Sequence, residues 1–186
     1  MALAAYSPAT YNDLPYLPVA GESFDKKNGY ELVATFRELF RKHKVDRVFG
    51  LSLLHRHFDL DERERLVEYN GTAVPWDQDI KKFVQPNNWT FKGDIVRPFE
   101  FYYNGVEGAT KDVVTPDTTK YQAFVESFKE LLVQYNAADL FGLCSYPGDD
   151  YPGRVEVTQA RANINLHPKD VSSQSLVPYS AQKHHR

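Results

Sequence analysis

The fold is predicted by residues 35–51, TFRELFRKHKVDRVFGL, which return without a gap as residues 127–143, SFKELLVQYNAADLFGL. The offset is 92 throughout, and six of the 17 positions are identical. Each copy begins with apolar residues at helical spacing and continues into a short apolar run that is typical of a strand. A match that crosses a helix–strand junction is hard to obtain by chance, so it indicates an internal duplication.

A second strand is expected after each copy, because residues 66–68 (LVE) match residues 154–156 (RVE) at an offset of 88. We therefore predict an α+β fold with a pseudo-twofold duplication of a helix–strand–strand unit. The two copies cover about residues 28–75 and 118–168. Their helices are expected to pack on one face of a mostly antiparallel sheet, with each first strand paired to its second strand as a hairpin.

The whole chain, residues 1–186, is expected to form a single domain, since its length fits one hydrophobic core. Residues 1–27 are rich in Pro, Tyr, Ser and Asn, which predicts an extended, mobile N-terminal arm. The chain from Pro168 onward is rich in Ser and Gln and is expected to be a mobile tail. The predicted core comprises the apolar faces of both copies, namely Phe36, Leu39, Phe49, Leu51, Phe128, Leu131, Phe141 and Leu143.

Charge and cysteine content limit the classes of partner. The net charge is −3, from 22 basic and 25 acidic residues, so binding to nucleic acid or to an anionic membrane surface is not expected. No stretch approaches the length of a transmembrane helix. Cys144 is the single cysteine, which rules out an internal disulfide and favours a reducing compartment. A cytoplasmic location is the resulting prediction.

Aromatic residues are abundant, with 12 Tyr and 12 Phe among 186 residues. Such a surplus is typical of a large core, of a ligand pocket or of a subunit interface. The number of tyrosines favours a lined pocket, because a buried phenol needs a polar partner. A homodimer is kept as a further option.

His55 and His57 are the best candidates for chemistry. Residues i and i+2 of a strand face the same way, so both imidazoles should project together at the end of the apolar strand that begins near Phe49. Such a pair can hold a divalent metal, of which Zn, Fe and Mn are the expected ions. The pair can instead act in acid–base catalysis, or be two solvated residues at a sheet edge. At an offset of 92 the equivalent positions are Pro147 and Asp149, which favours a site in the first copy only.

A metal would need a third ligand, for which the sequence offers Glu62 in the turn and Glu68 on the returning strand. Glu68 is the better choice because a paired strand holds its side chain rigidly. However, Glu156 occupies the equivalent position in the second copy, which favours a structural role common to both copies. The predicted catalytic residues are therefore His55, His57 and Glu68.

Residues 50–71 resemble the first metal motif of the cupin family. The string here is Gly50, four residues, His55-x-His57, four residues, Glu62, eight residues, Gly71. The family pattern has five residues before the histidines and six before the last glycine, and its second motif has no counterpart in residues 140–170. The resemblance implies a metal-dependent enzyme with the two histidines among the ligands.

The functional prediction is a small-molecule enzyme of the lyase, isomerase or hydrolase type. It would use the His55–His57 pair in an aromatic-lined pocket, with or without a metal. The first alternative is a protein that binds a small molecule or a partner without catalysis, and the second is a cupin-like metal-dependent enzyme.

Overall fold

The structure is a computed structural model that describes residues 2–105 and 114–171. Four α-helices are found in these residues: α1 (Pro8–Asn12), α2 (Leu17–Lys26), α3 (Gly29–Lys42) and α4 (Gln122–Gln134). The strands are β1 (Ala2–Leu3), β2 (Phe49–Leu53), β3 (Glu64–Tyr69), β4 (Thr72–Asp77), β5 (Val84–Lys92), β6 (Ile95–Tyr103), β7 (Phe141–Ser145), β8 (Val155–Gln159) and β9 (Ala162–Leu166). The predicted α+β class is confirmed. Within the described residues, none of the helices combines the length and apolarity needed to cross a membrane.

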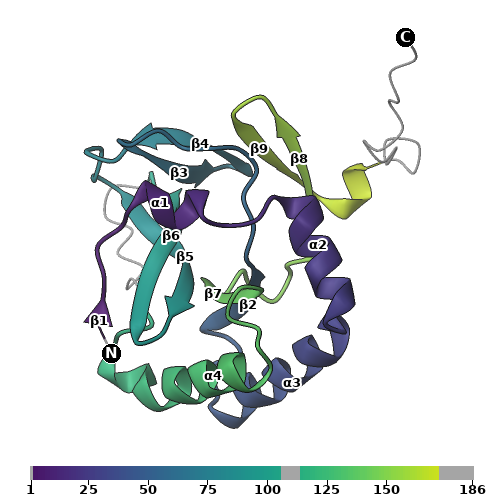
Figure 1. Ribbon diagram of the computed structural model, residues 1–186. Helices are drawn as coiled ribbons and strands as arrows, with labels where there is room; N and C mark the ends of the chain where they lie inside the picture. Colours follow the sequence, from purple (N-terminus) through teal and green to yellow (C-terminus); the bar gives the residue numbers. More distant parts are fainter. Residues whose placement is uncertain (1, 106–113, 172–186) are drawn as a thin grey trace.

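All strands belong to one curled sheet with the order β2-β7-β5-β6-β3-β4-β9-β8, and β1 adds to β6 (Figure 1). The β3–β6 and β1–β6 pairings are parallel, and the others are antiparallel. The sheet is therefore mostly antiparallel, as predicted. Its curl brings the ends of the strand order, β2 and β8, toward each other, and this closure forms the candidate site.

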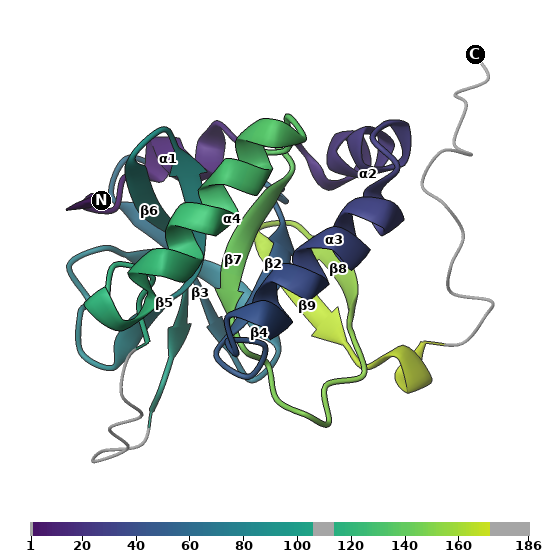
Figure 2. The ribbon, with the colours of Figure 1, turned by 90° about the horizontal axis from the view of Figure 1, so that it is seen from below.

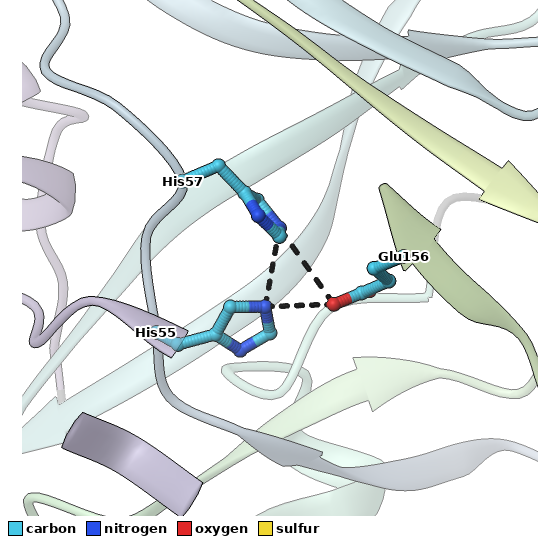
Figure 3. A group of neighbouring side chains, drawn as sticks. All are labelled: His55, His57 and Glu156. Atoms are coloured by element: carbon cyan, nitrogen blue, oxygen red, sulfur yellow. Dashed lines mark hydrogen bonds and ion pairs between the residues drawn. The ribbon is translucent and has the colours of Figure 1, made fainter. Parts of the chain in front are cut away.

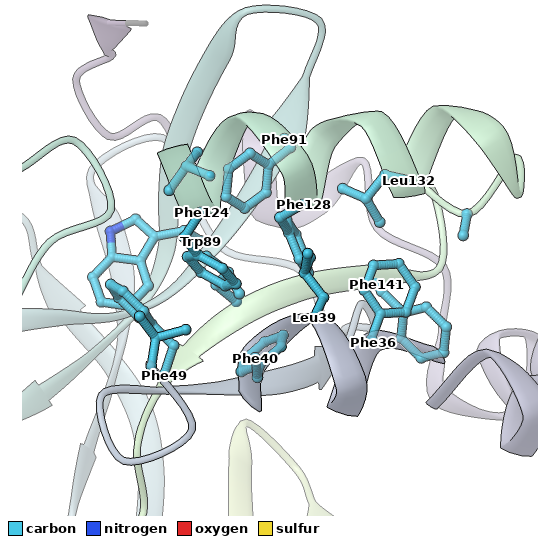
Figure 4. Packing of buried hydrophobic residues seen from close by; sticks show 14 of the residues in the cluster. Phe36, Leu39, Phe40, Phe49, Trp89, Phe91, Phe124, Phe128, Leu132 and Phe141 are labelled. Carbon is cyan, nitrogen blue, oxygen red and sulfur yellow. The ribbon is translucent and has the colours of Figure 1, made fainter. Parts of the chain in front are cut away.

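Helices α3 and α4 lie side by side over β2 and β7 (Figure 2). Aromatic rings fill the layer between helices and sheet: the Phe36 ring centroid lies 5.2 Å from that of Phe128 and 5.6 Å from that of Phe141 (Figure 4). Six of the eight predicted core residues are buried, and Leu51 and Leu131 are half-buried against the same cluster. The predicted helical faces are thus confirmed.

The two helix–strand junctions have the same backbone geometry at the offset of 92. Lys44 and Asn136 both adopt a left-handed conformation, with φ of 56° and 48°. The following residues, Val45 and Ala137, each donate a backbone hydrogen bond to a carbonyl in the last turn of the preceding helix, at 3.0 and 2.8 Å. These features agree with the predicted match over residues 35–51 and 127–143.

The predicted hairpins are wrong. Strand β2 pairs with β7, so that Leu51 lies opposite its equivalent Leu143, whereas β3 pairs with β4 and β6, and β8 pairs with β9. The chain leaves β2 because Leu54, Phe58 and Leu60 are buried in a second apolar cluster beneath α1. Residues 160 and 161 form the tight turn between β8 and β9.

The expected N-terminal arm is also wrong. Residues 8–12 and 17–26 are helical, and Pro8 and Pro18 lie in the first turns of α1 and α2, where the missing N–H of proline costs no hydrogen bond. Tyr11 is fully buried in the second cluster. This segment is therefore part of the domain. Most of the expected tail, residues 172–186, lies outside the described residues.

Candidate metal centre

The His55–His57 segment lies just beyond β2, which ends at Leu53, so the two histidines are not on the strand where the sequence pattern predicts them. The two rings still converge: their Nε2 atoms are 3.2 Å apart, and their planes meet at 86° (Figure 3). The expectation that both imidazoles point to one place is met, although regular strand geometry does not produce it.

The N-terminal segment fixes the backbone of the histidine pair. The Tyr11 hydroxyl accepts a 3.0 Å hydrogen bond from the backbone N–H of His57. The N–H of Arg56 donates to the Pro15 carbonyl at 2.8 Å, and the Arg56 guanidinium lies 4.3 Å from the centre of the Tyr16 ring. The residues predicted to form an arm therefore hold the segment that carries the two histidines.

Glu156, on β8, is the carboxylate that faces the two rings. Its Oε2 lies 2.9 Å from His55 Nε2 and 3.7 Å from His57 Nε2 (Figure 3). Glu68 is near but not part of this group, because its Oε2 faces Arg154 Nη1 at 3.3 Å. Glu62 is exposed in the turn before β3. Sequence reasoning therefore missed the third member, although the match between Glu68 and Glu156 named it as an equivalent position.

The three atoms form a triangle of the size that a first-row metal requires. Its sides are 2.9, 3.2 and 3.7 Å. In a tetrahedral site with bonds of about 2.0–2.1 Å, two ligand atoms are separated by roughly 3.3–3.4 Å. Two histidines and one carboxylate on one side of a metal leave the opposite positions open, as in catalytic zinc and non-haem iron sites.

Each member is also held by a second partner. His55 Nδ1 lies 2.9 Å from the Leu53 carbonyl oxygen, which can only accept, so Nδ1 carries a proton. His57 Nδ1 lies 2.9 Å from the Thr158 hydroxyl. Arg154 Nε pairs with the other oxygen of Glu156 at 3.2 Å. Outer partners of this kind orient the ligands of metal sites.

The electrostatics of the group are strongly coupled. Burial alone lowers the pKa of His55, but the hydrogen bond that it donates to Glu156 and the charges of Glu156 and Glu100 outweigh burial, so this pKa is raised. Burial and the charge of His55 lower the pKa of His57 to about 4. Burial raises the pKa of Glu156, but the bond to His55 and nearby positive charges bring it below its ordinary value. At neutral pH His57 is therefore neutral and Glu156 ionised.

A second carboxyl, Glu100 on β6, lies deeper in the curl. Burial raises its pKa to about 7, against the lesser effects of His55 and Arg154. Asn88 Nδ2 donates to Glu100 Oε2 at 2.5 Å. Cys144 is close by on β7, and burial raises the pKa of its thiol to about 11, so it stays protonated and is a poor nucleophile.

A cavity of about 800 Å³ opens beside His55 and Glu156. Its walls include Tyr102, Tyr146 and Tyr151, together with leucines of β2 and the side chains of Glu68 and Arg154. This volume lies within the roughly 300–1,000 Å³ range of small-molecule sites. Two of the three residues, His55 and Glu156, thus border a space in which a small molecule fits, whereas His57 does not line it.

No protein-family model, curated protein or solved structure matches this chain. The resemblance of residues 50–71 to the first cupin motif therefore stays a prediction. Of that motif, His55 and His57 lie in the triad, whereas Glu62 lies outside it.

Proposed function

We propose that the protein is an enzyme acting on a small molecule with a divalent cation, Zn, Fe or Mn, held by His55, His57 and Glu156. The observation that carries this proposal is the convergence of the three ligand atoms within 4.8 Å of one another. Because His55 Nδ1 carries a proton, the lone pair of the neutral ring lies on Nε2 and points at the Glu156 carboxylate. Two electron-rich atoms at 2.9 Å repel each other unless a proton or a metal ion lies between them.

The surroundings support a metal ion in that place. Glu68, Glu100 and Glu156 lie close together around a single arginine, Arg154. All three carboxylates are half-buried, and partly desolvated carboxylates in excess of their cationic partners favour a bound cation. A divalent cation there would polarise a carbonyl group or activate a water molecule, which suits lyase, isomerase and hydrolase chemistry.

The direct test is a Co²⁺ titration of chelator-treated protein, followed by visible absorption. We expect one Co²⁺ per chain, with the absorption of a low-symmetry four- or five-coordinate site, and its displacement by Zn²⁺. The double variant His55→Ala/His57→Ala should stay folded and show no such absorption. A wild-type protein that binds no Co²⁺ under these conditions would rule out the metal.

Metal-free acid–base catalysis is the second candidate, and the 2.9 Å contact between His55 and Glu156 favours it. A carboxylate that holds an imidazole raises its basicity and fixes its orientation. Turnover that survives chelator but is lost on changing His55 would select this mechanism. A protein that binds small molecules in the cavity without turning them over is the non-catalytic alternative.

Three sequence-based predictions also remain proposals. We infer that the helix–strand units are products of duplication, supported by the matching junctions after Lys44 and Asn136. A homodimer is proposed from the surplus of aromatics, and sedimentation equilibrium would test it. A cytoplasmic location is proposed from the single Cys144, and imaging of the tagged full chain would test it.

A further inference from the structure

Arg154 is a cationic side chain that lies beside Glu156 and lines the cavity with it. Its Nε faces Glu156 Oε1 at 3.2 Å, and its Nη1 faces Glu68 Oε2 at 3.3 Å. Its third nitrogen, Nη2, forms no hydrogen bond with residues 2–105 or 114–171. The side chain keeps 34% of its exposure and lines the cavity. One arm of the guanidinium is thus available to a molecule in the cavity.

The charge of the cavity depends on the metal. Glu68 and Glu156 contribute two negative charges to its walls and Arg154 one positive charge. Without a metal the walls therefore carry a net negative charge of about one. Protonation of His55 can cancel this charge but cannot make the walls positive. A bound divalent cation adds two positive charges and offsets this negative charge in a partly enclosed space, where charges are poorly screened.

We infer that the metal-loaded cavity binds an organic monocarboxylate with an apolar or aromatic body, and that Arg154 pairs with its carboxylate. This inference rests on the proposed function. One free guanidinium arm among several carboxylates matches a singly charged carboxylate better than a doubly charged phosphate. The tyrosine and leucine walls match an apolar body, and such walls are usual in small-molecule sites.

The inference also predicts coupling between the two ligands. Metal and carboxylate should bind with positive cooperativity, because each reduces the electrostatic cost of the other. Thermodynamic linkage requires the same factor in both directions. The anion should therefore strengthen metal binding as much as the metal strengthens anion binding.

The test uses two molecules of the same size and shape, benzoate and the neutral benzamide. Zn²⁺ is titrated first by calorimetry, and the zinc-saturated full chain is then titrated with each probe and followed by NMR chemical shifts. We expect the zinc-saturated protein to bind benzoate at least about tenfold more tightly than benzamide. We also expect benzoate to bind at least about tenfold more weakly to the metal-free protein than to the zinc-saturated protein. Inorganic phosphate should bind more weakly than benzoate.

The variant Arg154→Gln, tested at saturating Zn²⁺, should lose at least about tenfold in benzoate affinity while its benzamide affinity stays unchanged. Arg154→Lys should retain part of the benzoate affinity, since it keeps the charge but not the planar fork. Equal binding of benzoate and benzamide, tighter binding of phosphate, or an unaffected Arg154→Gln variant would overturn the inference. The absence of Zn²⁺ binding in the first titration would instead overturn the proposed function, and the inference with it.

Discussion

His55 and Glu156 lie 101 residues apart, yet His55 Nε2 is 2.9 Å from Glu156 Oε2. His55 follows β2 and Glu156 lies on β8, the two ends of the strand order. Their contact therefore closes the curl of the sheet. A cation at this point would bind both ends of the sheet at once, so that metal binding and the shape of the cavity become coupled.

The ligand assignment predicts which side chains zinc binding requires. Each of the variants His55→Ala, His57→Ala and Glu156→Gln should lower the zinc affinity, measured by calorimetry, by more than about 100-fold. This loss exceeds the roughly 10–100-fold loss that follows the removal of an outer partner. Glu62→Gln is the control, because its exposed carboxylate lies outside the group and should leave the affinity unchanged. Wild-type affinity in Glu156→Gln would contradict the assignment.

Glu68→Gln separates the structure-based ligand set from the sequence-based one. Glu68 faces Arg154 and does not contact the imidazoles, so this variant should keep zinc affinity within about tenfold, the lower limit for an outer partner. The same calorimetric titration measures it. A loss as large as that of Glu156→Gln would restore Glu68 as the third ligand.

Zinc affinity should fall with decreasing pH, because the metal must displace the proton of His55. The pKa of His55 is raised above its ordinary value, so this competition begins at a higher pH than for an unperturbed imidazole. His57, with a pKa of about 4, stays neutral and adds no second proton above that pH. Below the pKa of His55 the affinity should therefore drop by about tenfold per pH unit. A pH-independent affinity between pH 5 and 7 would contradict this account.

Sequence periodicity was sufficient for the helices and the large core. The apolar spacing around Phe36 and Phe128 specifies one buried face for each helix, and the structure has those faces. Strand pairing could not be predicted in the same way, because Leu51 pairs with Leu143 through contacts far apart in the chain. Local pattern holds no information on such partners.

The candidate site shows the same division. His55 and His57 could be found because they are two residues apart. Glu156 could not be placed beside them, since only the curl of the whole sheet brings β8 to the end of β2. Tyr11 was missed because the prolines that start α1 and α2 were interpreted as loop residues.

Glu100 should make the stability of the metal-free protein depend on pH. Its pKa is about 7 when folded and near 4.5 when unfolded, so between these values the folded protein keeps a proton that the unfolded chain loses. The free energy of unfolding should therefore fall as pH rises from about 4.5 to 7, by about 3 kcal/mol at about 1.4 kcal/mol per unit of pKa shift. Glu100→Gln should remove this pH-dependent loss of stability. Urea unfolding should therefore show the variant to be more stable than the wild type at pH 8 but not at pH 4.5. Glu22→Gln, an exposed change, is the control, and parallel profiles for Glu100→Gln and the wild type would contradict the prediction.

Tyr11→Phe tests whether the N-terminal segment supports the site. The change leaves the backbone N–H of His57 without its acceptor, and it should lower the free energy of unfolding by about 1–3 kcal/mol. Zinc affinity should fall as well, because His57 is then held less rigidly. Tyr30→Phe is the matched control, because Tyr30 is 81% exposed. Removal of its hydroxyl should change the free energy of unfolding by no more than about 0.5 kcal/mol. Equal stability of the two variants would show that the segment does not hold the histidine backbone.

The most direct measurement is an anomalous difference map at the zinc absorption edge, from crystals of the full chain grown with Zn²⁺. The account predicts one strong peak about 2.0–2.2 Å from His55 Nε2, His57 Nε2 and Glu156 Oε2. That peak should face the cavity with at least one coordination position open to it. A map with no peak between these three atoms, or with its strongest peak at other side chains, would contradict the metal centre.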